Sequence, residues 1–174
     1  IDNNSFSIDQ DYLNWRYLKH PVFKYKMFLV KNTQSKEKIL VILRLHECLD
    51  GTKIVHITDI IGRFLNFKFV TPFVDKYMEE NQISAADFSC TKISLIYFLR
   101  RSGWFSVLDE DCIYCPNLFY PIEATHPSTT SIVSKSKIDF DHSPALEEVY
   151  LTKKDCALDL PTAETYKSLS LPFI

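Results

Sequence analysis

The sequence has 174 residues, of which 46% are hydrophobic and 14% aromatic, so it can bury one sizeable core and we expect a single domain over residues 1–174. Its 20 Lys and Arg residues nearly balance its 22 Asp and Glu residues, which excludes the strongly basic surface typical of nucleic-acid-binding proteins. No stretch reaches the roughly 18 apolar residues of a membrane-spanning helix, and the start shows no leader pattern. We therefore expect a cytoplasmic chain with no nucleic-acid partner and no membrane span.

The first fifty residues predict a short helix followed by strands. Asp9 or Asp11 can cap the helix, which must end before Pro21 because the residue before a proline avoids the helical region. Apolar runs at 26–30 and 39–45 predict two strands, and an Asp-Gly turn after them leads into a third. We expect these three strands to form an antiparallel meander.

Residues 53–104 predict a strand, a helix, a second strand and a second helix. The first strand ends at Gly62, and residues 83–88 form the second. Between the strands, apolar residues recur at helical spacing: Phe69, Val70, Phe73, Val74 and Tyr77. A helix joining two strands favours a parallel pair. Thr91 is placed to cap the second helix, and Gly103 is placed to end it.

The rest of the chain predicts a terminal strand pair and a less regular extension. The two strands are expected at 105–108 and 112–120, on either side of an acidic turn. Residues 123–174 begin with a stretch rich in Thr, Ser, Pro and Lys, and we expect them to pack on the domain as a C-terminal extension. The predicted fold class is therefore α/β, mixed α+β: an antiparallel meander, a βαβα unit and a terminal strand pair.

The five cysteines indicate a reducing compartment, because their number is odd and a chain of this length needs no disulfides. Cys112 and Cys115 have the spacing of a zinc or redox pair, but no second pair of ligands accompanies them. Their surroundings indicate a strand, on which positions three apart face opposite ways. We expect neither a metal site nor a disulfide there.

Chemically active side chains gather near the ends of the two predicted parallel strands. Histidine has an ordinary pKa suited to proton transfer, so His56 is a candidate general base. The alternative is a histidine packed in the sheet and hydrogen-bonded there. Asp59 is either a functional carboxylate or a cap or turn residue, and Cys90 follows the second strand, which also carries Asp87. Strand alternation predicts that His56 and Thr58 share one face, with Asp59 on the other.

The element order, with Arg100-Arg101-Ser-Gly103-Trp104 closing the second helix of the βαβ unit, resembles the GNAT superfamily of acyl-coenzyme-A-dependent acyltransferases. The segment Asp11-Tyr-Leu-Asn-Trp15-Arg16-Tyr17-Leu-Lys-His20-Pro21 resembles a signature of a subset of bacterial GNAT-like proteins, where it opens the second half of a longer chain. An acidic motif ending in proline, here Asp155 to Pro161, closes that half. The resemblance covers most of the 174 residues.

This resemblance implies a GNAT-like central mixed sheet and a partner, the N-terminal GNAT half of the same protein. Because the chain also begins at Ile1 rather than Met, we expect it to be a piece of a longer protein. The resemblance further implies a site for a coenzyme A thioester, with the pyrophosphate bound at Gly62 and Arg63 in the loop before a helix. GNAT enzymes often carry a tyrosine as general acid four residues before the glycine that ends the second helix, and Leu99 stands at that place here.

Two functions from different classes stay open. The first is acyl transfer from coenzyme A to an amine or hydroxyl of a small-molecule or glycan acceptor, such as a sugar or cell-envelope precursor. The candidate catalytic residues for this reaction are His56, Asp59 and Cys90. The second is a non-catalytic GNAT-like domain that binds substrate or serves as interaction partner of an active half. In both cases we expect acetyl-coenzyme A to bind weakly, with a dissociation constant above roughly 1 mM.

The candidate substrate-binding residues are Trp15, Arg16, Asp155 and Asp159. Trp15, Arg16 and Tyr17 have a structural alternative, in which they clamp the first helix to the sheet. Arg16 could equally form an ion pair with Asp155 or Asp159 that fixes the tail.

Overall fold

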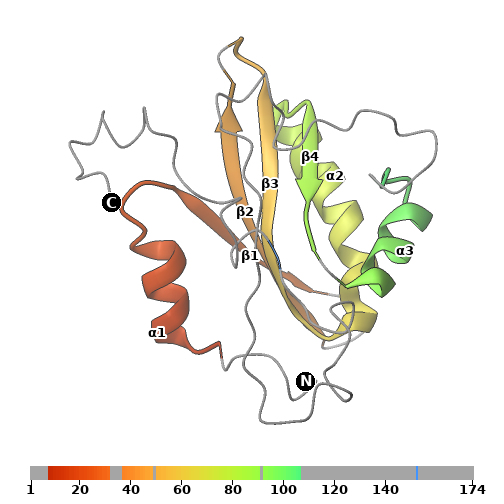
Figure 1. Cartoon of the computed structure of the whole chain (residues 1–174), viewed down its shortest axis with the longest axis horizontal. Coiled ribbons are helices and arrows are strands. Elements are labelled where there is room, and N and C mark those ends of the chain that lie inside the picture. Colours follow the sequence, from red (N-terminus) through yellow and green to blue (C-terminus); the bar gives the residue numbers. More distant parts are fainter. Residues whose placement is uncertain (1–7, 32–36, 49, 91, 107–151, 153–174) are drawn as a thin grey trace, which may run out of the picture.

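The computed structural model describes residues 8–31, 37–48, 50–90, 92–106 and 152 (Figure 1). Helical segments and strands follow one another along these residues. In chain order they are α1 (Gln10–Leu13), the π-helical segment η1 (Asn14–Leu18), β1 (Tyr25–Lys31), β2 (Lys38–Glu47), β3 (Lys53–Gly62), the 3-10 segment η2 (Phe64–Phe69), α2 (Val70–Asn81), β4 (Ala85–Phe88) and α3 (Ile93–Arg101).

The four strands form one mixed sheet in the order β1-β2-β3-β4. β1 is antiparallel to β2 and β2 is antiparallel to β3, which confirms the predicted meander. β3 and β4 are parallel, and η2 and α2 make the crossover between them. The predicted parallel pair with its connecting helix is therefore confirmed, and the described part is an α+β structure with a mixed sheet.

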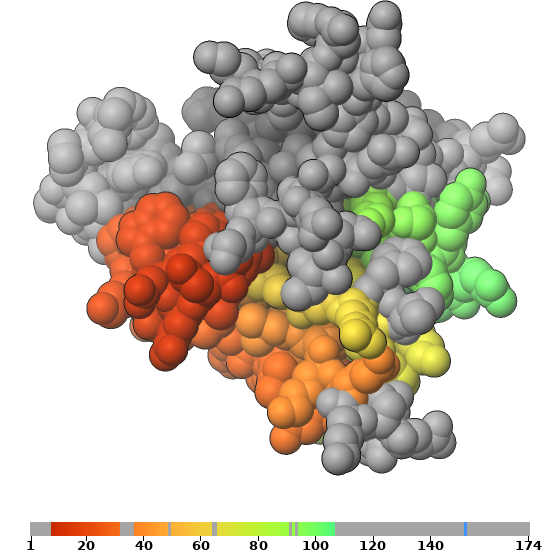
Figure 2. Space-filling view, turned by 90° about the horizontal axis from the view of Figure 1, so that it is seen from below, coloured from red at the N-terminus to blue at the C-terminus, as the bar shows by residue number. Residues whose placement is uncertain are grey.

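Helices lie on both faces of this sheet. α1 and η1 lie against one face, while α2 and α3 lie against the other (Figure 1). In the space-filling view, the red surface of α1 and the green surface of α3 likewise lie at opposite sides of the molecule (Figure 2). We call the two sides of the sheet the α1 face and the α2 face.

Alternation along β2 distributes apolar side chains between the two faces, as the pleat of a strand requires. Val41 and Leu43 belong to the core on the α2 face, together with Val70 and Val74 of α2. Ile42, between them in sequence, belongs to a smaller core on the α1 face with the buried rings of Tyr17 and Tyr25. The sheet is thus covered by apolar packing on both sides.

β3 carries a β-bulge at Thr58. Leu43 of β2 pairs with Ile57, and Ile42 pairs with Asp59, so Thr58 has no partner residue in the β2 ladder. A bulge of this kind inserts one extra residue into a strand and interrupts its alternation. The side chains on either side of the bulge show the result: Ile57 and Ile60 both pack into the core on the α2 face.

Asp59 pairs with Ile42 and accepts a hydrogen bond from the Tyr17 hydroxyl, so it lies on the α1 face. His56 precedes Ile57 in regular alternation and also faces the α1 side. That His56 and Thr58 share a face stays a prediction, because the bulge interrupts the alternation at Thr58. The prediction that Asp59 lies on the opposite face is wrong, because it assumed an unbroken strand.

The helix ends agree in part with the sequence predictions. Oδ1 of Asp9 accepts a hydrogen bond from the Tyr12 backbone N–H at 2.8 Å, so Asp9 is the cap of α1. Gly103 has φ +88°, and the N–H of Trp104 donates to the carbonyl of Leu99 at 3.1 Å, which is how glycine commonly ends a helix. Thr91, the expected cap of the second helix, lies outside the described residues; α3 begins at Ile93, and its N-cap is Lys92 without a side-chain hydrogen bond.

Several predicted elements lie outside the described residues: strand 112–120 with Cys112 and Cys115, residues 107–108, and all of the extension 123–174 except Thr152. Residues 105 and 106 are described and belong to no strand. Thr152 is buried and forms an antiparallel bridge with Cys90. Within the described part of the chain, every helix is too short or too polar to cross a bilayer.

Candidate functional site

One row of residues crosses the α1 face of the sheet at right angles to the strands. Tyr25 pairs with Arg44, Arg44 pairs with His56, and His56 pairs with Asp87, so all four strands contribute one residue. We call these four residues the polar row. Tyr25, Arg44 and His56 are buried, whereas the side chain of Asp87 is 22% exposed.

His56 and Asp87 form the closest polar contact in this row. Nδ1 of His56 lies 2.8 Å from Oδ1 of Asp87, and the two residues come from adjacent parallel strands. An ionised carboxylate can only accept, so with Asp87 ionised the proton of a neutral imidazole lies on Nδ1 and the basic lone pair on Nε2. The Nε2 atom is itself buried. Asp87 therefore orients the ring and selects the tautomer, as a carboxylate does beside a general base.

Arg44 brings a buried cation to the same row. Its guanidinium carbon lies 4.3 Å from the centre of the Phe23 ring, a cation–π contact on the segment that leads into β1. Only 5% of Arg44 is exposed. The row thus carries a cation, an imidazole and a carboxylate on three neighbouring strands, which is a concentrated set of charges for the face of a sheet.

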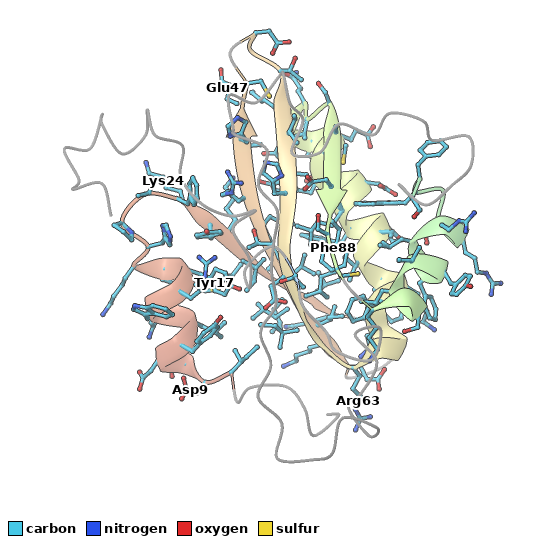
Figure 3. The ribbon with its side chains drawn as sticks, in the orientation of Figure 1. Asp9, Tyr17, Lys24, Glu47, Arg63 and Phe88 are labelled. Atoms are coloured by element: carbon cyan, nitrogen blue, oxygen red, sulfur yellow. The ribbon has the colours of Figure 1, made fainter. Side chains whose placement is uncertain are left out.

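Asp59 lies next to this row and is fully buried. Its Oδ2 accepts a hydrogen bond from the Tyr17 hydroxyl at 3.4 Å, and its Oδ1 accepts one from the Ile60 N–H at 2.9 Å. Tyr17 comes from η1 and points from that helical layer toward the sheet (Figure 3). Asp59 is neither a helix cap nor a turn residue, so both structural alternatives for it are wrong.

The Trp-Arg-Tyr and His-Pro segment mainly holds α1 and η1 on the sheet. Nη1 of Arg16 donates to the Tyr25 hydroxyl at 3.0 Å, and the guanidinium also lies over the rings of Tyr17 and Tyr25. Nδ1 of His20 accepts from two backbone N–H groups in the turn before β1. The clamp interpretation is confirmed for Arg16 and Tyr17. It is wrong for Trp15, which is 69% exposed.

Gly62 and Arg63, the two residues predicted at the pyrophosphate site, make contacts within the protein. Gly62 has φ +155°, and a Cβ atom there would lie 2.9 Å from Cγ1 of Ile39, so close packing against β2 accounts for this glycine. Arg63 directly follows the C-terminal end of β3 (Figure 3). Its Nη1 lies 3.5 Å from Oε1 of Glu37 in an exposed ion pair. The loop then enters η2 rather than opening α2 directly. Both residues are thus explained by contacts within the sheet and its loops.

The structure does not bring Cys90 to the polar row. Cys90 packs against the core of the α2 face, whereas His56 lies on the α1 face. Its thiol donates to the carbonyl of Lys92 at a sulfur–oxygen distance of 3.9 Å. Burial raises the pKa of this thiol to about 11, and a hydrogen bond with the Lys92 backbone opposes this rise to a smaller extent. At neutral pH Cys90 is therefore a protonated thiol and lacks the thiolate that nucleophilic catalysis requires.

Sequence reasoning missed Arg44 and did not select Asp87 as the partner of His56. A charged residue inside the apolar run of β2 was the available signal for Arg44, since such a residue is rarely buried without a specific partner. Asp87 could be paired with His56 only through the register of two parallel strands, which the sequence does not encode locally. Asp155 and Asp159 lie outside the described residues.

Among the described residues, no group of three or more His, Cys, Asp or Glu side chains is arranged to hold a metal ion. No family model, no curated protein and no solved structure matches the chain. The resemblance to the GNAT superfamily accordingly rests on the element order and the short motifs alone.

Proposed function

We propose that this chain is an acyltransferase-like domain, in which the His56–Asp87 pair removes a proton from an amine or hydroxyl acceptor. The observation that carries the proposal is the 2.8 Å contact between Nδ1 of His56 and Oδ1 of Asp87. A histidine oriented in this way is the usual proton acceptor at neutral pH, and such catalysis contributes about 10²–10⁴-fold to a rate.

The acyl donor that the GNAT resemblance implies is a coenzyme A thioester. Gly62 lies six residues beyond His56 on β3, which places the loop roughly 20 Å from the histidine. The pyrophosphate and the thioester lie at opposite ends of the pantetheine arm, so separate sites for them suit this ligand class. The loop offers the single cation Arg63, and an exposed ion pair contributes about 1 kcal/mol or less, so we expect weak binding.

The acceptor approaches the polar row from the β4 side in this proposal. Asp87 is the most exposed member of the row, while His56 is covered completely. Arg44 lies on the other side of His56, on β2. When Nε2 takes the acceptor's proton, the Asp87 carboxylate at Nδ1 stabilises the imidazolium that forms.

The test is a comparison of acyl transfer rates at millimolar acetyl-coenzyme A, with a panel of primary amines, amino sugars and sugar hydroxyls as acceptors. Free thiol release is the measured signal. We expect Asp87→Asn and His56→Gln to lower the rate by about 10²-fold or more. His46→Gln is the matched control, because the His46 ring lies 5.9 Å from the ring of His56 and is only half-buried. Equal rates in His56→Gln and His46→Gln would remove His56 from the mechanism.

A second function, a non-catalytic GNAT-like domain, is favoured by one observation, the pairing of Arg63 with Glu37 beside a glycine that β2 packing already explains. In that case no acceptor is acylated, and titration calorimetry detects no binding of acetyl-coenzyme A below about 1 mM. Micromolar binding that is lost in Arg63→Ala, but kept in the neighbouring variant Lys68→Ala, would reject the second function.

A further inference from the structure

Thr58 occupies an unusual position in the sheet. It has no partner residue in the β2 ladder because of the bulge, and it lies one residue beyond the β3–β4 ladder, which ends at Ile57 and Phe88. The residue is fully buried. Its hydroxyl Oγ1 has no hydrogen-bond partner among the residues that the structure describes.

A buried hydroxyl without a partner is costly. Leaving such a group unsatisfied destabilises a protein by about 1–3 kcal/mol, so buried polar groups are nearly always bonded to protein or to ordered water. The Thr58 hydroxyl therefore points to a hydrogen-bonding ligand at the bulge.

The neighbours of Thr58 are polar as well. His56, two residues before it, and Asp59, directly after it, are both fully buried. A water inside a protein needs two to four polar partners, and proteins hold about one buried water per 27 residues. The Thr58 hydroxyl and the carboxylate of the adjacent Asp59 supply two such partners. Complete burial of the Thr58 and Asp59 side chains fits a small permanent occupant at the bulge.

We propose that Thr58 binds an ordered internal water at the bulge of β3, beside Asp59. The water completes the hydrogen bonding of the hydroxyl and links the bulge to the buried carboxylate. It stabilises the register shift that turns Asp59 toward Tyr17. This inference is independent of acyl transfer, so its test uses the chain without donor or acceptor.

The test combines detection of the water with two substitutions at Thr58. In the unsubstituted chain, we expect a water within hydrogen-bond distance of Oγ1 in a high-resolution crystal structure and water–amide cross-relaxation at residues 57–59 in NMR spectra. Thr58→Ser keeps the hydroxyl and the water. Thr58→Val has nearly the same shape without the hydroxyl, so it loses the water and the melting temperature falls.

The sign of the change in melting temperature in Thr58→Val shows whether the Thr58 hydroxyl is bonded to a water or has no partner. If no water is present, valine relieves an unsatisfied group and raises the melting temperature. A dry site in the unsubstituted chain, or a higher melting temperature in Thr58→Val than in the unsubstituted chain, would overturn the proposal.

Discussion

The hydroxyl of Tyr17 lies 3.4 Å from Oδ2 of Asp59, although the two residues are 42 positions apart in the sequence. Tyr17 belongs to η1 and Asp59 belongs to the part of β3 displaced by the bulge. Both side chains are buried, at 1% and 0% exposure. This contact therefore ties the helical layer of the α1 face to the centre of the sheet, and it exists because the bulge turns Asp59 toward that layer.

Tyr17→Phe should destabilise the fold by about 1–2 kcal/mol, because it leaves an oxygen of a buried carboxylate with one donor fewer. Urea unfolding measures the change. Tyr97→Phe is the control, since Tyr97 is 62% exposed and its substitution should change stability by less than about 0.5 kcal/mol. If the two variants unfold at the same urea concentration, the Tyr17–Asp59 contact contributes nothing to stability.

Gly62→Ala should destabilise the chain even without any ligand. The added Cβ would meet Cγ1 of Ile39 at 2.9 Å, and overpacking of this kind costs about 1–3 kcal/mol. Gly51→Ala is the control for backbone strain without a steric clash. Gly51 has φ +83°, but no atom lies within 4 Å of the place that its Cβ would take. It should cost only the strain of about 1–2 kcal/mol. A smaller loss in Gly62→Ala than in Gly51→Ala would contradict the packing account of Gly62.

Cys90 should react slowly with alkylating reagents at neutral pH. With a pKa of about 11, its thiolate fraction at pH 7 is on the order of 10⁻⁴, against a few per cent for an ordinary cysteine. Iodoacetamide labelling followed by peptide mass spectrometry measures the rate, with the denatured chain as reference. The rate should rise with pH up to about 11. Rapid labelling of the folded chain at pH 7 would restore Cys90 as a candidate nucleophile.

The pKa of Asp50 should lie below its ordinary value of 3.8. The main cause is the hydrogen bond that its carboxylate accepts from the Thr52 backbone N–H, and the second is the one from the Thr52 hydroxyl. A folded-state pKa below the unfolded value means that the ionised form stabilises the fold. This contribution is complete above the unfolded pKa and is lost as pH falls through the folded pKa. NMR titration of the Asp50 carboxyl measures the pKa directly.

Thr52→Ala removes the side-chain hydrogen bond and keeps the backbone one, so the pKa of Asp50 should rise only part of the way toward 3.8. Asp50→Asn should remove this component of the pH dependence of stability. An unchanged pKa in Thr52→Ala would show that the backbone N–H alone lowers it.

The architecture of the sheet was largely readable from the sequence, because it depends on local patterns. β-Branched runs predicted β2 and β3, and apolar spacing predicted α2. The parallel pairing of β3 and β4 followed from the helix between them. Gly103 predicted the end of α3, because the residue after a helix often has a left-handed conformation that glycine adopts most easily.

The candidate site was only partly readable, because it depends on register. His56 was selected for its chemistry, but its contact with Asp87 requires the alignment of two strands that α2 separates in sequence. The bulge at Thr58 has no strong local signal, and it alone decides the face of Asp59. The π-helical form of η1 was also unforeseen, since nothing in Asn14–Leu18 distinguishes it from an ordinary helical turn.

The alignment of Arg44, His56 and Asp87 has a consequence for how this chain tolerates change. These residues meet only while both of their strand ladders keep the present register. A slip of one residue in β4 would turn Asp87 away from His56 to the α2 face and bring an apolar neighbour in its place. An insertion or deletion in the connection between α2 and β4 could therefore abolish the His56–Asp87 pair while every residue of the pair remained. The length of that connection therefore matters to the His56–Asp87 contact as much as the presence of the two side chains.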